Sequence, residues 1–234
     1  MNAWELLGQT RTPDGSDMSL TVRDGEYVIR VNGNTLMSSR VHGSEETLAE
    51  AACGHLTAGG GSRSQNPQVP HPQALVGGLG MGFTLRATLD LLPATATVTV
   101  SELVPVVVEW NRGPLGHLAG HPLQDPRVQV QKEDVGATLR SNPDRFDAIL
   151  LDVDNGPTAF TTDSNHDLYD NTGIAAAYTA LRKSGTLAVW SAWEDRKFEH
   201  RLRFHGFTAS TQSARARANK GGMRHTIFVG EKTS

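Results

Sequence analysis

The segment that most constrains how this chain can fold is a glycine-rich turn, VGGLGMG, at residues 76–82. A short apolar run, Ala74 to Val76, precedes the turn, and a helix-compatible segment, Thr84 to Leu91, follows it. Glycines let the chain turn sharply there and let a ligand approach the backbone. The free N–H groups at the start of the following helix lie beside such a ligand. The spacing G-x-G-x-G, from Gly78 to Gly82, therefore predicts a ligand-binding turn, and the alternative is a tight turn without a ligand.

Short apolar runs alternate with helix-compatible segments along the larger part of the chain. The runs lie at residues 74–76, 97–100, 128–130, 148–151 and 186–190, and the helical segments at 84–91, 104–111, 135–140 and 169–182. This alternation predicts an α/β fold with a doubly wound, mostly parallel, Rossmann-like sheet that helices cover on both faces. Two further runs, at 207–211 and 225–229, predict a closing antiparallel hairpin.

The beginning of the chain follows a different pattern, which predicts a small β-rich module. Asp24-Gly25 separates two β-rich runs and is a strong hairpin signal. Ser44 precedes Glu45 and Glu46, so we expect Ser44 to cap a helix whose acidic first turn suits its positive end. The predicted units are a hairpin and helix module at residues 1–57, a linker rich in glycine and proline at 58–72, and the Rossmann-like domain at 73–234.

Acidic side chains follow three of the predicted parallel strands. Glu102, Asp134 and Asp152 come shortly after the runs that end at residues 100, 130 and 151. Because the ligand crevice of a doubly wound sheet lies at the carboxyl ends of its strands, we expect the three to converge. Glu102 can accept hydrogen bonds from both hydroxyls of a ribose, and the alternative is an ordinary exposed glutamate. For Asp152 the alternative is a cap on a loop turn through Asn155-Gly156.

Five segments in order resemble the motifs of the spermidine synthase family, a branch of the class I S-adenosylmethionine-dependent methyltransferase fold. They are ALVGGLGMGFTLR, TVSELVPVVVEWNR, DPRVQVQKEDVGATL, FDAILLDVDNGPTAF and LRKSGTLAVWSA, between residues 73 and 192. The resemblance implies the class I methyltransferase topology and a nucleoside co-substrate, either S-adenosylmethionine or its decarboxylated form, without a metal. It also implies a small-molecule acceptor such as an amine, and a homodimer through the N-terminal hairpins.

The resemblance further implies a role for each matching residue. Glu102 would hold the ribose hydroxyls, and Asp134 would bind the adenine amino group. Asp152 would be catalytic and help to activate the attacking amine. The remaining nucleoside-binding residues would be Gly78, Gly80, Met81 and Gly82, and the acceptor-binding residues Asp154, Asn155 and Tyr169.

Three positions depart from the family pattern. Met81 stands where the family motif GGGDGG has the aspartate that contacts the aminopropyl amine of the decarboxylated co-substrate. Without that carboxylate the site favours ordinary S-adenosylmethionine more than the family does. Asn155 replaces the second acid of the D-x-x-D pair that handles a diamine, and Gly43-Ser44 replaces a Tyr-Gln dipeptide.

We therefore predict a spermidine-synthase-like transferase that moves an aminopropyl or alkyl group to a small acceptor. One alternative is a methyltransferase, which Met81 and Asn155 favour, and another is a nucleoside-binding protein without turnover. His117 and His121 are the closest histidine pair, and a metal site there is a minor alternative. The basic stretch from Arg215 to Arg224 predicts a solvated loop, with phosphate or RNA contact as the alternative.

Composition excludes several other classes. The formal charge of −3 implies no nucleic-acid partner, and a single cysteine, Cys53, excludes a disulfide scaffold. No apolar run approaches the ~20 residues that span a bilayer, so no membrane partner is expected. The first 15 residues lack the apolar segment of a signal peptide. We expect a soluble, cytoplasmic protein.

Overall fold

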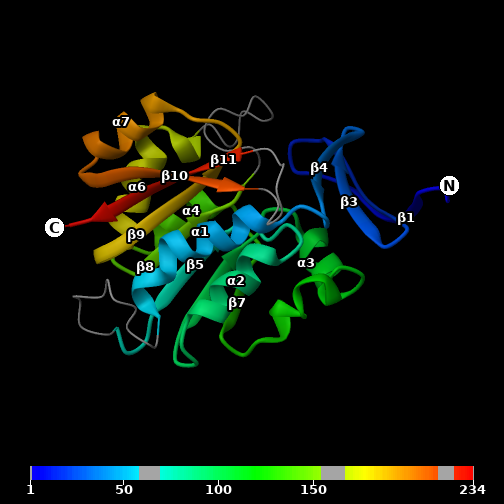
Figure 1. Cartoon of the computed structure of the whole chain (residues 1–234), viewed down its shortest axis with the longest axis horizontal. Helices are drawn as coiled ribbons and strands as arrows, with labels where there is room; N and C mark the ends of the chain where they lie inside the picture. Colours follow the sequence, from blue (N-terminus) through cyan, green and yellow to red (C-terminus); the bar gives the residue numbers. More distant parts are fainter. Residues whose placement is uncertain (1, 58–68, 154–166, 216–223, 234) are drawn as a thin grey trace.

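The described residues of this chain form two β-sheets. The smaller sheet is formed by the N-terminal residues. The computed structural model describes residues 2–57, 69–153, 167–215 and 224–233 (Figure 1). Both residues of the Asp24-Gly25 turn have positive φ, 48° and 76°, as the predicted hairpin requires. The four strands of this antiparallel sheet lie in the order β1 (Glu5–Arg11), β2 (Asp17–Arg23), β3 (Glu26–Val31) and β4 (Asn34–Ser38).

The larger sheet has seven strands in the order β10-β11-β9-β8-β5-β6-β7. Strands β5 to β9 pair in parallel, and β11 runs antiparallel between β9 and β10. The doubly wound sheet and its closing hairpin confirm the predicted fold class. The strands span β5 (Gln73–Gly77), β6 (Thr97–Ser101), β7 (Val128–Gln131), β8 (Phe146–Leu151), β9 (Leu181–Ser191), β10 (Phe207–Arg215) and β11 (Arg224–Lys232).

Helices cover both faces of the larger sheet and divide the core into two layers. Along β5, Ala74 and Val76 face one layer and Leu75 faces the other, as the two-residue period of a strand requires. The first layer packs against α1 (Gly43–Cys53), α2 (Phe83–Leu91) and α3 (Pro105–Arg112). The second packs against α4 (Val135–Ser141), α6 (Asn171–Ala180) and α7 (Arg196–Phe204). The short helices are η1 (Gly54–Leu56), η2 (Gly116–Ala119) and η3 (Pro122–Gln124).

Helix α1 packs on the larger sheet, although it follows directly after the N-terminal hairpins. It lies beside α2 and contacts strands β8 to β11 (Figure 1). The prediction that Ser44 caps this helix is wrong. His42 occupies the N-cap position without a side-chain capping bond, and Ser44 lies within the first turn. The Ser44 hydroxyl donates to the Glu45 carboxylate at 2.8 Å instead, and the His42 ring stacks on Phe83 with ring centroids 4.4 Å apart.

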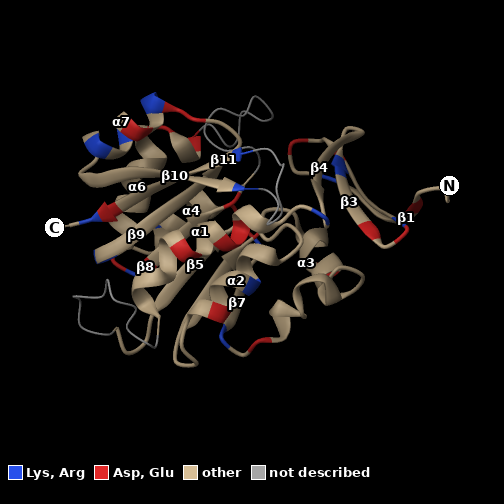
Figure 2. Cartoon of the chain, in the orientation of Figure 1, with Lys and Arg blue, Asp and Glu red and all other residues tan. Residues whose placement is uncertain are grey.

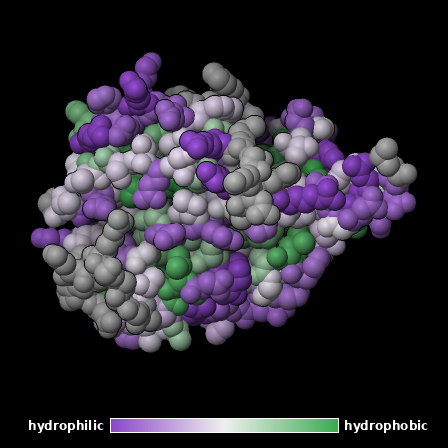
Figure 3. All heavy atoms as spheres, in the orientation of Figure 1, coloured by the Kyte–Doolittle hydropathy of each residue, from purple (hydrophilic) through white to green (hydrophobic). Residues whose placement is uncertain are grey.

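Strand β1 and helix α7 have no counterpart in the predicted elements. The sequence of β1, ELLGQTR, does not alternate strictly between apolar and polar residues, and a bulge interrupts its pairing with β2. The boundaries at residues 57 and 72 stay predictions. Much of the surface in the view of Figure 3 is hydrophilic, with hydrophobic residues showing in smaller areas. In the parts of the chain described, no helix combines the length and apolar character needed to cross a membrane.

Candidate functional site

The glycine turn lies at the carboxyl end of β5, which lies between β8 and β6 in the larger sheet. Gly78 has a φ of 86°, and a Cβ added there would lie 2.4 Å from the carbonyl oxygen of Asp152, so only glycine fits. Gly82, with a φ of 85°, occupies the N-cap of α2. The Asn111 side chain donates to the Gly80 carbonyl at 2.8 Å and holds the middle of the turn. The sequence-predicted arrangement of strand, turn and helix is confirmed.

Glu102 ties the end of β6 to the glycine turn. Its Oε2 accepts from the backbone N–H of Leu79 at 2.9 Å, and its Oε1 accepts from that of Val104 at 2.8 Å. The residue is only 8% exposed, so the alternative of an ordinary exposed glutamate is wrong. A carboxylate oxygen can accept more than one hydrogen bond, so these contacts leave room for a ribose. Ribose binding stays a prediction.

Asp152 lies on the other side of the glycine turn, at the end of β8. Its backbone N–H donates to the Gly77 carbonyl at 2.9 Å. The Thr84 hydroxyl, in the first turn of α2, donates to Asp152 Oδ2 at 2.5 Å. Burial raises the pKa of Asp152 above the ordinary carboxyl value, and the hydrogen bond from Thr84 opposes part of the rise. A carboxylate with raised proton affinity is suited to accept a proton near neutral pH.

Glu45 is a member of this site that the sequence pattern did not reveal. It lies in the first turn of α1, where Figure 2 shows acidic residues. Burial raises the pKa of Glu45 to about 7, and the nearby charge of Asp152 contributes to the rise. We interpreted Glu45 only as an acidic residue at a helix start. The available signal was its position directly after Gly43-Ser44, the dipeptide that replaces a family motif.

Asp134 lies at the end of β7, two strands away from the glycine turn. It caps α4, because its Oδ1 accepts from the backbone N–H of Ala137 at 2.9 Å. Arg140 lies 3.8 Å from the same oxygen. Helix capping accounts for these contacts, and adenine binding stays a prediction. Along the carboxyl edge of the sheet the order is therefore Asp152, the glycine turn, Glu102 and Asp134.

The structure places Met81 differently from what we expected of a nucleoside-binding side chain. Met81 is 2% exposed and packs in the apolar layer that contains α2. Tyr169 is also buried, with its ring 5.9 Å from that of Phe198, and its hydroxyl donates to the Val153 carbonyl at 3.2 Å. Tyr169 thus supports the backbone next to Asp152, and contact with an acceptor stays a prediction. Asp154, Asn155 and Gly156 lie outside the described residues.

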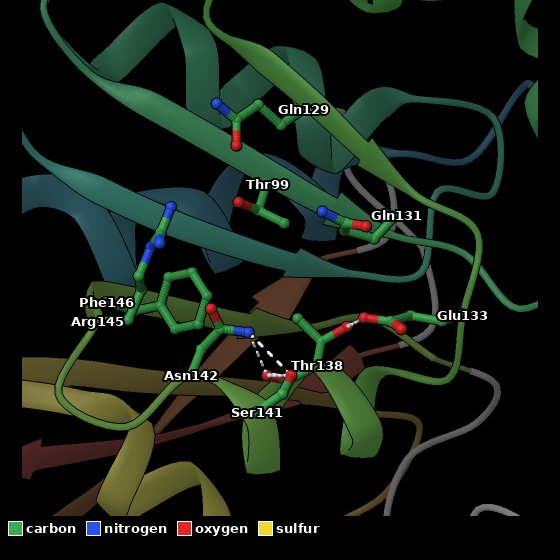
Figure 4. A pocket seen from close by; sticks show the side chains of 9 residues that line it. All are labelled: Thr99, Gln129, Gln131, Glu133, Thr138, Ser141, Asn142, Arg145 and Phe146. Carbon is green, nitrogen blue, oxygen red and sulfur yellow. Dashed lines mark hydrogen bonds between the residues drawn. The ribbon is translucent and has the colours of Figure 1, made fainter.

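A separate polar cavity lies between the edge of the sheet and α4 (Figure 4). Its volume is about 280 Å³, and Arg145 is the cationic side chain on its wall. None of the predicted site residues that the structure describes lines this cavity. The lining residues are Thr99, Gln129, Gln131, Glu133, Thr138, Ser141, Asn142, Arg145 and Phe146.

Of the histidines that suggested a metal alternative, His117 lies in η2 and His121 is the N-cap of η3. The ring of His117 packs edge-on against Tyr27 of the small sheet, with centroids 5.4 Å apart. Across the described ranges, no three His, Cys, Asp or Glu side chains are grouped so as to hold a metal ion. Packing between η2 and the small sheet accounts for His117.

The strand order and the turn after β5 define the class I methyltransferase fold. One similar structure is the 1,6-didemethyltoxoflavin-N1-methyltransferase of Burkholderia thailandensis, with bound S-adenosylhomocysteine. It has a TM-score of 0.52 and 20% identity, over 82% of this chain and 80% of that chain. Within this fold the chain is also similar to a solved spermidine synthase. Its TM-score with the spermidine synthase of Thermotoga maritima is 0.73 at 18% identity, over 97% of this chain and 72% of that chain.

A sequence relative agrees with this likeness. The chain is 29% identical over 131 residues to polyamine aminopropyltransferase 2 of Pseudomonas aeruginosa. The match covers 51% of this chain but only 33% of that protein, so the chain spans about a third of this curated relative. No protein-family model matches the chain.

Proposed function

We propose that this protein is a transferase that binds an S-adenosylmethionine-type nucleoside at the glycine turn and transfers an aminopropyl or alkyl group to a small acceptor. The observation that carries the proposal is the position of two carboxylates around that turn. The Glu102 carboxylate accepts from the Leu79 N–H within the turn, and the Asp152 carboxylate accepts from the Thr84 hydroxyl just after it. The close backbone approach at Gly78 and the N-terminus of α2 suit a nucleoside that lies against the chain.

The reaction is an in-line displacement at a carbon attached to the sulfonium. The acceptor nitrogen bonds to this carbon, and the electron pair of the breaking C–S bond stays on sulfur. The proton of the acceptor moves to Asp152. Because the sulfonium is already a good leaving group, the protein contributes alignment, exclusion of water and a base. The Thr84 hydrogen bond orients Asp152 for this role.

Methyl transfer is the second candidate, and one observation favours it. Met81 places an apolar, buried side chain at the position where the family has an aspartate for the aminopropyl amine. Without a charge there, the site has less attraction for the cation of a decarboxylated co-substrate and less repulsion for the carboxylate of the intact one. The methyltransferase neighbour agrees with this candidate.

Calorimetric titration with S-adenosylmethionine, its decarboxylated form and methylthioadenosine tests the proposal, followed by mass spectrometry of products with a panel of amines. Tighter binding of the decarboxylated form and an aminopropylated product support aminopropyl transfer. Tighter binding of the intact form and a methylated product support methyl transfer. Binding without any product leaves a nucleoside-binding protein, and absence of binding refutes the proposal.

A further inference from the structure

Glu45 lies near the proposed base, Asp152, although the two residues are far apart in sequence. Stacking of His42 on Phe83 brings the first turns of α1 and α2 together. Thr84, in that turn of α2, donates to Asp152, and Glu45 belongs to the matching turn of α1. The charge of Asp152 therefore acts on Glu45.

One side chain, Ser44, contacts the carboxylate of Glu45 directly, and a second, His225, contacts Ser44. The Ser44 hydroxyl donates to Glu45 Oε2 at 2.8 Å, and Nδ1 of His225 lies 3.2 Å from the same hydroxyl oxygen. A hydroxyl has a single hydrogen, so Ser44 accepts from His225 when it donates to Glu45. Burial lowers the pKa of His225, which keeps its ring neutral near pH 7. The neutral ring therefore carries its one N–H on Nδ1.

We propose that Glu45, held by Ser44 and His225, is a positioning residue that makes Asp152 a stronger base toward the acceptor. This inference rests on the proposed function. Repulsion between two carboxylates is mutual, so an ionised Glu45 increases the proton affinity of Asp152. During transfer, the N–H bond of the acceptor breaks, its proton bonds to an oxygen of Asp152, and Glu45 stabilises that protonated state.

The surroundings of Glu45 contain few other charges. Thr84, from α2, is uncharged, and His42 stacks on a phenyl ring rather than reaching Glu45. The charged or titratable groups that face Glu45 from the described residues are Asp152 at the end of β8, Glu46 on its own helix and, through Ser44, His225 of β11. Glu46 is exposed and contributes least, which makes it a matched control.

The test compares the pH dependence of kcat for four variants, with decarboxylated S-adenosylmethionine and putrescine as probes. Glu45→Gln removes the repelling charge, so the acidic limb should move to lower pH by roughly 0.5–1 unit and kcat should fall roughly three- to tenfold. Ser44→Ala removes a donor that stabilises the ionised Glu45 carboxylate. Glu45 is then less ionised and repels Asp152 less, so the limb should move to lower pH by a smaller amount than in Glu45→Gln. Ser44→Thr should restore the wild-type profile, and Glu46→Gln should retain it.

The same variants are titrated without substrate, following the side-chain carboxyl carbons by NMR. Shifts of the Asp152 titration to lower pH in Glu45→Gln and, to a smaller extent, in Ser44→Ala support the inference even where the wild type turns over neither probe, an outcome that counts against the proposed function alone. Nitrogen NMR of His225 should show the Nδ1–H form in the wild type and lose it in Ser44→Ala. Equal shifts in Glu45→Gln and Glu46→Gln, or a shift to higher pH in Ser44→Ala, overturn the inference.

Discussion

The raised proton affinity of Glu45 makes the stability of this protein depend on pH in a way that Glu45→Gln should abolish. The pKa of Glu45 is about 7 in the folded chain, against an ordinary value of 4.5. Between these values the folded state holds a proton that the unfolded state releases. The free energy of unfolding therefore falls as the pH rises from 4.5 to 7, and this loss is complete above pH 7.

The size of the effect follows from the shift. A shift of about 2.5 pKa units corresponds to at most about 3 kcal/mol, and partial exposure of the side chain reduces it to about 1–3 kcal/mol. Glutamine keeps the shape and accepts the same hydrogen bond from Ser44 but carries no titrating proton. Glu45→Gln should therefore match the wild type near pH 4.5 and exceed its unfolding free energy by about 1–3 kcal/mol at pH 8.

Urea denaturation followed by tryptophan fluorescence, between pH 4.5 and 8, measures this difference. Glu46→Gln is the matched control, since Glu46 is exposed on the same helix turn and should show no comparable gain. A difference between Glu45→Gln and the wild type that does not change with pH would refute the reasoning. An equal gain in Glu46→Gln would assign the effect to the net charge of the helix start.

Three other substitutions test the site around the glycine turn. Gly78→Ala should unfold the turn or abolish nucleoside binding in calorimetry, because the Cβ of alanine would lie 2.4 Å from the carbonyl oxygen of Asp152. A stable variant that binds the nucleoside would contradict this. Glu102→Ala should weaken nucleoside binding at least about tenfold and lower thermal stability, since it leaves the Leu79 and Val104 N–H groups without the bonds to Glu102; unchanged binding would remove the ribose assignment. Asp152→Asn should reduce turnover at least about a hundredfold with nearly unchanged nucleoside affinity, and normal turnover would exclude it as the base.

The glycine turn shows why one part of the site was predictable. The left-handed φ of Gly78 and of Gly82 is a local requirement, and a local requirement selects residue types at fixed spacing. Strand and helix periodicities are local in the same sense, so Ala74 and Val76 face one core layer while Leu75 faces the other. The order of acidic residues at strand ends follows from the parallel sheet that these periodicities predict.

Other parts of the site depended on contacts that no local pattern encodes. Met81 has the expected place in the turn, but packing around α2 decides that its side chain enters the core. Ser44 has the residue type of a helix cap, yet the helix begins one residue before it, and the Ser44 hydroxyl bonds to Glu45 and lies beside His225.

By itself, the sequence predicted a small β-rich module, a doubly wound, mostly parallel sheet, and a glycine turn after one of its strands with Glu102 and Asp152 after others. The tertiary structure alone decided that Glu45 lies near Asp152 and that His225 supports Glu45 through Ser44. The physical reason is the range of the forces involved. Backbone conformation depends on neighbours along the chain, whereas the proton affinity of a buried carboxylate depends on charges a few ångströms away in space, however distant they are in sequence.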